Sequence, residues 1–170
     1  MEETKFSRDS LVIKTSIVLP PDTNNHGTMF GGKLMAYIDD VAAISAMRHS
    51  RKMVVTASTD SVDFLHPIYK GNSVCLEAFV TYTGRSSMEI MVKVIAEDLL
   101  TGVRNICAIS FLTFVAIDEN GKPTPVPRLI PRTETEKNLF ETGKARAEAR
   151  KKRRKDTEQI AQTFGAEMPW

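Results

Sequence analysis

The segment from about Phe30 to Ser50 places the strongest constraint on how this chain can fold. It has the length of an ordinary helix, and its apolar side chains fall on every side of that helix: Leu34, Met35, Tyr37, Ile38, Val41, Ile44 and Met47. A helix that is apolar all round must be buried. Because the chain has 170 residues, of which 42% are hydrophobic, we expect one core, in which other segments wrap this helix.

Five strand-like segments can form that wrapper. They are rich in β-branched and other apolar side chains, and Gly, Pro and Asn punctuate the connections between them. The expected strands are residues 11–19, 54–65, 74–83, 88–97 and 103–117. Since most of the connections are short, we expect an antiparallel sheet. One long helix with a five-stranded antiparallel sheet predicts an α+β fold.

The chain changes character after Ile117. Residues 118–133 contain four prolines and a turn signal, so we expect an extended connection there. The following charged segment predicts a helix that begins at a Thr133 or Thr135 cap, and its polar surface predicts an appendage. We therefore divide the chain into a main domain at residues 1–118, an extended linker at 119–132 and a helical tail at 133–170.

Composition narrows the class of protein. No apolar run is long enough to span a membrane, and residues 1–10 are polar and unlike a signal peptide, so we expect a cytoplasmic protein. Cys75 and Cys107 are isolated, which favours two buried, reduced thiols over a disulfide or a zinc site. The net charge of +2 conceals a basic run, since residues 144–156 hold eight Lys and Arg against two acids.

The stretch from Asp22 to Asp40, DTNNHGTMFGGKLMAYIDD, joins a Gly-rich loop to the start of the central helix. Its glycines, Gly27, Gly31 and Gly32, permit positive φ and the close approach of a ligand. A helix start also presents unbonded N–H groups that can stabilise an oxyanion. The pattern matches neither a dinucleotide-binding nor an NTP-binding loop.

Two aspartates follow within this helix, about 100° apart in angle. Asp40 lies close in angle to Lys33, which can partly neutralise it. No basic side chain lies on the same side of the helix as Asp39, which lies instead among apolar positions: Met35, Ala43 and Ala46. An unpaired carboxylate on a buried helix is costly unless it reaches water, a donor or a ligand. Asp39 is therefore either a core aspartate bonded to backbone amides of a neighbouring strand, or a functional carboxylate.

Several motifs together resemble one protein family. The stretches PPDTNNHGTMFGGKLMAYIDDVAA, DFLHPIYKGN, YTGRSSMEI and FVAIDENGKPTPVP are similar to the single-hotdog acyl-CoA thioesterases of the bacterial YciA/YkhA and brain acyl-CoA hydrolase type. The resemblance covers residues 11–127. It implies the hotdog fold, in which a five-stranded antiparallel sheet wraps one long helix, and thus agrees with the pattern of the residues. It further implies edge-paired dimers with an active site at each interface, commonly assembled as hexamers.

The resemblance also implies the chemistry, which is hydrolysis of an acyl-CoA thioester to a fatty acid and CoA without a metal or cofactor. It assigns the catalytic aspartate to Asp39 and its partner to Asn24 of the facing subunit. Asp39 would act as general base on water, or as a nucleophile, while Asn24 positions water or substrate. Backbone amides near Gly31 and Gly32 would polarise the thioester carbonyl.

The turn Thr83–Ser87, TGRSS, is the expected site for the CoA phosphates. Its members Thr83, Gly84, Arg85, Ser86 and Ser87 offer small side chains, backbone amides and one guanidinium. A plain hairpin turn is the alternative for this segment. Lys70 and Arg104 are weaker candidates for the same phosphates.

Two other functions stay open on the sequence alone. A hotdog domain can be a noncatalytic acyl-CoA-binding module, because a fold does not determine a function. The basic run at residues 144–156 can bind polyanions such as nucleic acid, although it lacks interleaved aromatic residues. We favour instead a helix that covers a neighbouring subunit, and we expect no nucleic-acid partner.

Overall fold

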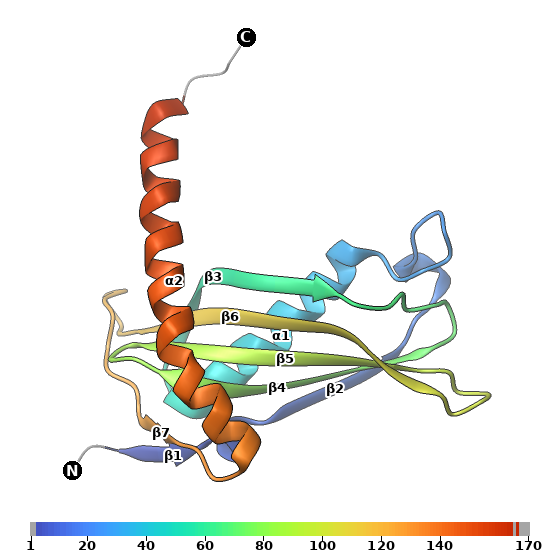
Figure 1. The fold of residues 1–170 in the computed structure, drawn as a ribbon, viewed down its shortest axis with the longest axis horizontal. Helices are drawn as coiled ribbons and strands as arrows, with labels where there is room; N and C mark the ends of the chain where they lie inside the picture. The colour runs from blue at the N-terminus through green and yellow to red at the C-terminus, as the bar shows by residue number, and fades with distance from the viewer. Residues whose placement is uncertain (1–2, 165, 167–170) are drawn as a thin grey trace.

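A five-stranded antiparallel sheet in the order β2-β4-β5-β6-β3 forms the body of the molecule, which we describe from a computed structural model (Figure 1). The structure describes residues 3–164 and 166. Helix α1 (Gly31–Ser50) lies along one face of the sheet, and helix α2 (Glu134–Phe164) crosses the other face. This is the expected α+β hotdog fold, with a long C-terminal helix added.

The strands form where the sequence predicts them. They are β2 (Val12–Ile17), β3 (Met53–Phe64), β4 (Ser73–Thr83), β5 (Ser87–Glu97) and β6 (Arg104–Ile117). All four neighbouring pairs in this sheet are antiparallel. Alternate side chains of β4 and β5, such as Leu76, Val80, Ile90 and Val94, are fully buried and belong to the same apolar core as the inner side of α1.

Helix α1 is buried on one side only, which corrects the expectation of complete burial. Leu34, Ile38 and Val41 lie in the core, whereas Met35 and Ile44 stay 46% and 45% exposed. The reason is geometric, because a single sheet covers only one side of a helix. One subunit therefore leaves an apolar helix face without a cover.

Two short strands lie outside the main sheet and were not predicted. β1 (Thr4–Phe6) pairs in parallel with β7 (Arg128–Ile130). Of the two, β7 lies inside the segment that we expected to be only extended. The guanidinium carbon of Arg132 lies 3.5 Å from the centroid of the Phe6 ring. The linker is therefore attached to the N-terminal segment of the chain.

Thr133 caps α2, as one of the two predicted alternatives requires. Its hydroxyl accepts a hydrogen bond from the N–H of Glu136 at 3.2 Å, and the Glu136 carboxylate accepts one from the N–H of Thr133 at 3.2 Å. This reciprocal pair is a capping box.

The first half of α2 packs on the sheet of its own subunit, so the expectation of a mere appendage is wrong there. Gly143 lies against Tyr82 so closely that an added Cβ would come within 2.6 Å of that side chain. The rings of Phe140 and Tyr82 lie 5.5 Å apart. The last turns of α2 project beyond the sheet (Figure 1), and there the predicted role in covering a neighbour stays a prediction.

Three arginines of the basic run hold α2 to the sheet. Arg146 bonds through two nitrogens to Glu89, at 2.7 and 2.9 Å. Arg150 and Arg153 reach Asp60 at 3.4 and 2.5 Å. Their spacing of four and three residues puts them on one side of the helix. Three of the eight cations that suggested a polyanion site therefore serve contacts within the subunit.

Among the described residues, no helix is long and apolar enough to cross a membrane. Both cysteines are free thiols, but only Cys107 is fully buried, while Cys75 is half-buried. Burial raises the pKa of the Cys107 thiol. The division into three domains stays a prediction.

Candidate active site

Asp39 lies half-buried on α1 and faces strand β3. Its carboxylate accepts a hydrogen bond from the hydroxyl of Thr56 at 3.1 Å. No Lys, Arg or His within the described part of the chain forms an ion pair with Asp39. Its partner is a hydroxyl, and no backbone amide of residues 3–164 and 166 donates to the Asp39 carboxylate as the alternative interpretation requires.

Asp40 is neutralised, but the sequence predicted the wrong partner. Lys14 on β2 lies 3.2 Å from the Asp40 carboxylate. Lys33 turns instead toward Asp22, at 3.5 Å. The helical angle between Lys33 and Asp40 was right, but an acid in the preceding loop lies within reach of Lys33. The two neighbouring aspartates thus have different surroundings, because only Asp40 has a cation.

Asn24 shapes the loop before α1. Its side-chain oxygen accepts hydrogen bonds from the N–H groups of His26 at 2.9 Å and Thr28 at 3.3 Å, and its amide nitrogen donates to the Thr28 hydroxyl at 2.9 Å. Gly27 has φ +74°, which closes the turn. Within the described residues of one chain, no hydrogen bond joins Asn24 to Asp39.

The two remaining glycines of the loop open the helix, and they do so without the positive φ that the sequence permits. Neither Gly31 nor Gly32 has a positive φ, because both belong to the first turn of α1. At Gly32 an added Cβ would lie 2.6 Å from the ring of Phe30. Gly31 lines a cavity of about 260 Å³ together with Phe64 and the residues that follow it. A helix start that borders a cavity can direct N–H groups at a bound oxygen atom.

The turn Thr83–Ser87 is tied to its surroundings through the backbone. The backbone carbonyls of Arg85 and Ser86 accept hydrogen bonds from the N–H groups of Val126 and Ala116, respectively. The N–H of Gly84 donates a hydrogen bond to the carbonyl of Ser87. Each of these bonds is 2.9 Å long. The side chain of Arg85 is exposed, and it lines a cavity of about 510 Å³ with Thr83 and Gly84. The structure thus brings three of the five predicted residues to one cavity.

Register relates this turn to Asp39. Thr56 pairs with Phe114, which pairs with Met88, which pairs with Thr83. Since neighbouring strands lie about 4.8 Å apart, Thr83 is about 14 Å from Thr56 along one row of the sheet. Thr56, which hydrogen-bonds Asp39, therefore lies on the same row of the sheet as Thr83, the first residue of the candidate phosphate site.

Lys70 and Arg104 are not brought to that row within one subunit. Arg104 pairs with Glu97 at the far end of β5, ten residues after Ser87 and so about 34 Å away. Lys70 lies in the connection that leads to Ser73, which also pairs with Glu97. Within residues 3–164 and 166, no three His, Cys, Asp or Glu side chains are grouped as metal ligands.

Comparison with known proteins agrees with this geometry. The family model of the thioesterase superfamily matches residues 26–103. The uncharacterized acyl-CoA thioester hydrolase YkhA of Bacillus subtilis is 58% identical over 168 residues, which cover 99% of this chain and 98% of that protein. The chain belongs to the hotdog-fold acyl-CoA thioester hydrolases. This membership favours hydrolysis over a noncatalytic acyl-CoA-binding module.

Other relatives of this thioester hydrolase include mammalian proteins. The cytosolic acyl coenzyme A thioester hydrolase of Rattus norvegicus is 41% identical over 143 residues, which cover 83% of this chain and 37% of the rat protein. This chain therefore spans a little over a third of the length of that relative.

Solved structures in the family agree in fold over almost the whole chain. Acyl-CoA hydrolase from Staphylococcus aureus, in complex with butyryl-CoA, CoA and CoA disulfide, has a TM-score of 0.90 at 46% identity and covers 95% of this chain and 98% of its own. A hexameric acyl-CoA thioesterase has a TM-score of 0.87 at 55% identity, and the match covers 89% of this chain and 97% of that one. The Staphylococcus aureus enzyme has also been solved as variants in which an aspartate, an asparagine or a threonine is replaced by alanine.

Proposed function

We propose that Asp39 is the catalytic carboxylate of this acyl-CoA thioester hydrolase, and that Thr56 holds it in position. The observation that carries the proposal is the 3.1 Å hydrogen bond from Thr56 to an aspartate that lacks a cation. Spacing supports it independently. The asparagine, aspartate and threonine replaced in the Staphylococcus aureus relative are separated by 15 and 17 positions, as Asn24, Asp39 and Thr56 are here.

Asp39 acts as the general base in this proposal. It takes a proton from water as the water oxygen bonds to the thioester carbonyl carbon, and the proton then passes to the CoA sulfur as the C–S bond breaks. The second route, in which Asp39 attacks the carbonyl and water cleaves the resulting anhydride, uses the same residue. N–H groups of Gly31 and Gly32, supplied by the facing subunit together with Asn24, stabilise the oxyanion in either route.

Asn24 joins the site from a second subunit in this proposal. Asp39 lies eight residues after Gly31, or about 12 Å along α1, and the Asn24 loop precedes that helix start. The free edge of β3, with Met53 and Val55 exposed, and the uncovered face of α1 support pairing of two sheets there. Such pairing brings the loop of one copy to the helix of the other.

Mixing variants tests the shared site. Asn24→Ala and Asp39→Ala, each inactive alone, should regain part of the wild-type thioesterase activity after subunit exchange, because some interfaces then carry both native residues. Exchange verified by mass spectrometry with no gain in activity would refute the sharing. Hydrolysis itself is measured as free thiol released from acyl-CoA substrates of C2 to C18, which also gives the preferred chain length.

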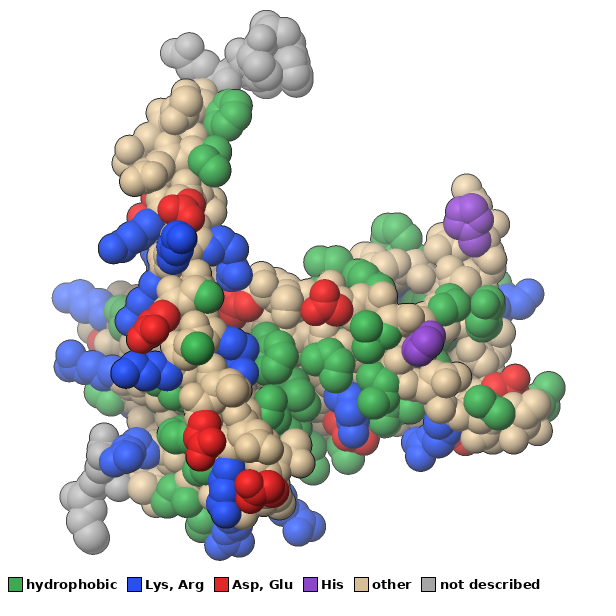
Figure 2. Space-filling model, viewed as in Figure 1, with side chains coloured by type: hydrophobic (Ala, Val, Ile, Leu, Met, Phe, Trp, Pro, Cys, Tyr) green, Lys and Arg blue, Asp and Glu red, His purple; other side chains and the backbone are tan. Residues whose placement is uncertain are grey.

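The assembly that we propose is a hexamer of three dimers. Phe79, Met91 and Phe111 form a row across three strands on the face that α2 crosses, and all three stay only half-buried. Figure 2 shows hydrophobic side chains gathered on the sheet beside α2. A partly uncovered apolar face of this kind supports contact between dimers, as does the hexameric state of a relative. Light scattering tests it, and a monomer would refute the whole interface.

We further propose that CoA phosphates bind at the turn Thr83–Ser87 and that the protein works in the cytoplasm. The exposed Arg85 at a cavity supports the first proposal. The mammalian relatives described as cytosolic support the second. Loss of CoA affinity in Arg85→Ala tests the turn, and unchanged affinity would refute its role.

A further inference from the structure

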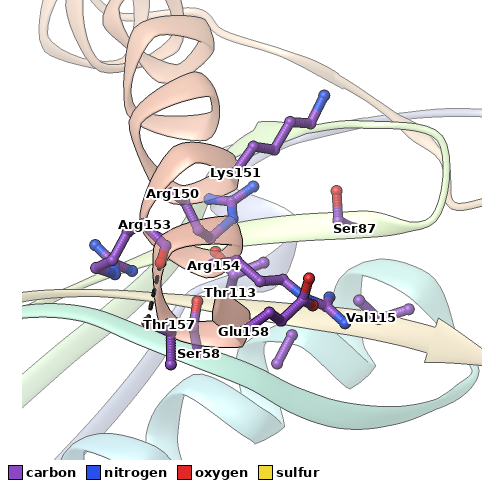
Figure 3. A pocket seen from close by; sticks show the side chains of 11 residues that line it. Ser58, Ser87, Thr113, Val115, Arg150, Lys151, Arg153, Arg154, Thr157 and Glu158 are labelled. Carbon is purple, nitrogen blue, oxygen red and sulfur yellow. Dashed lines mark hydrogen bonds and ion pairs between the residues drawn. The ribbon is translucent and has the colours of Figure 1, made fainter. Parts of the chain in front are cut away.

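The cavity at the start of α1 contains one titratable side chain that the proposed chemistry leaves unused. It has a volume of about 260 Å³ and lies between the first turn of α1 and the segment that follows β3. His66 lines it together with Thr28 and Gly31, and the remaining lining residues are apolar, Leu34 and Phe64 among them. This cavity is separate from the cleft between α2 and the sheet that Figure 3 shows.

Backbone pairing places His66 opposite Gly31. Thr28 and Tyr69 form an antiparallel bridge, and a backbone hydrogen bond of 2.7 Å beside it joins the same two segments. In an antiparallel pair, each step forward on one segment corresponds to one step back on the other. Three steps beyond the bridge therefore lead to Gly31 on one segment and to His66 on the other. Both residues line the cavity, as this register requires.

The side chain of His66 is exposed and lies on the side of the helix start. The ring of Phe64 lies 3.8 Å from the position of a Cβ added to Gly31. His66 follows Phe64 by two residues, and Pro67 favours an extended backbone at His66, so the two side chains leave the chain on the same side. The N–H of His66 donates to the carbonyl of Cys107 at 3.3 Å, which fixes the backbone. Within residues 3–164 and 166, the imidazole has neither a hydrogen bond nor an ion pair.

The cavity also extends toward Asn24. The Asn24 amide donates to the Thr28 hydroxyl at 2.9 Å, and Thr28 lines the cavity. Asn24, Gly31 and His66 therefore lie around one space within a single subunit. In the proposed function, this half of the site faces Asp39 of the other subunit. A thioester carbonyl oxygen bound by the helix N–H groups would thus lie in the space that His66 borders.

We propose that His66 donates a hydrogen bond to the thioester carbonyl oxygen, together with the N–H groups of Gly31 and Gly32 of its own subunit. An imidazole has an N–H in its neutral and in its charged form, so it can donate in either. Negative charge develops on the carbonyl oxygen as water attacks, and a donor placed there stabilises the transition state. The proposal rests on the proposed hydrolysis at Asp39 and adds a catalytic residue from the facing subunit.

Thiol release from acyl-CoA by two variants of this histidine tests the proposal. His66→Ala should lower kcat by about 10²-fold, the loss typical of one oxyanion donor, while KM changes by less than about threefold. His66→Gln should retain more of the wild-type kcat than His66→Ala, because its amide can still donate. The matched control is His26→Ala, which removes an exposed histidine outside the lining of the cavity and should leave kcat within about twofold of the wild type.

Subunit mixing shows to which half of the site His66 belongs. A mixture of His66→Ala with Asp39→Ala should regain up to about a quarter of the wild-type activity, because one site of each mixed dimer then has all its native residues. A mixture of His66→Ala with Asn24→Ala should regain none, since these residues belong to the same half. Recovery with Asn24→Ala and none with Asp39→Ala would overturn the placement of His66.

Three kinetic results would overturn the role of His66 as a donor. They are a kcat in His66→Ala that falls no further than in His26→Ala, a rise in KM alone, and equal losses of kcat in His66→Ala and His66→Gln. Asp39→Asn in the same assay separates this failure from that of the proposed function. An inactive Asp39→Asn beside a fully active His66→Ala would refute His66 alone, whereas an active Asp39→Asn would refute the proposed function.

Discussion

The contact between Arg146 and Glu89 predicts how strongly α2 stabilises the subunit. The Glu89 side chain is 1% exposed, and Arg146 covers it with two hydrogen bonds. Arg146→Ala leaves that carboxylate buried without its cation, a change that costs about 3–5 kcal/mol in a fully buried pair. Arg146 itself is 27% exposed, and the Thr81 hydroxyl still donates to Glu89 at 2.8 Å. We therefore expect a loss of about 2–4 kcal/mol.

Urea unfolding followed by circular dichroism measures this loss, at one fixed protein concentration because assembly affects the midpoint. Lys144→Ala is the matched control, since Lys144 is an exposed cation two residues earlier on α2. Its unfolding free energy should change by less than about 0.5 kcal/mol. If Arg146→Ala lowers the unfolding free energy no more than this control does, the docking of α2 on its own sheet does not stabilise the subunit in the way described.

Three further predictions concern the core and the tail. Gly143→Val should destabilise the protein by about 1–3 kcal/mol in the same unfolding assay, because its side chain would overlap Tyr82, and an unchanged midpoint would contradict this packing. Burial lowers the pKa of His49 below its ordinary value of 6.5, so the unfolded chain binds a proton more readily. Stability should therefore fall as pH decreases below about 6.5, and His49→Gln should flatten that dependence; an equal slope in both proteins would exclude His49 as the cause. Truncation after Arg132 should lower the melting temperature of the subunit as well as weaken the hexamer, which light scattering resolves, and a truncated protein that melts like the full chain would contradict the docking of α2.

The main sheet and α1 were predictable because their signals are local. Alternating apolar residues and short turns give the strands, and a 3.6-residue period gives the helix. The pairing of β1 with β7 was not predictable, because each strand has three residues and β7 lies between prolines. A pattern this short carries no periodicity.

Contacts between distant elements account for most of what the sequence did not reveal. The arginines of α2 resemble a solvated basic run until the register of the sheet places Glu89 and Asp60 beneath them. Thr56 was overlooked for a similar reason, since only the packing of α1 on β3 shows that its hydroxyl meets Asp39. Asp39 itself stood out, because an acid without a basic neighbour on an apolar helix is visible in the sequence alone.

Thiol release by a pair of neighbouring variants tests the central claim most directly. Asp39→Asn and Asp40→Asn remove one charge each from adjacent positions of α1, so their effects on the charge of the protein are matched. Asp39→Asn should lower kcat by about 10²- to 10⁴-fold, as expected for the loss of a positioned base, without lowering the melting temperature appreciably. Asp40→Asn should retain activity within about a factor of three, because it removes only an exposed ion pair with Lys14. An inactive Asp40→Asn beside an active Asp39→Asn would contradict the account.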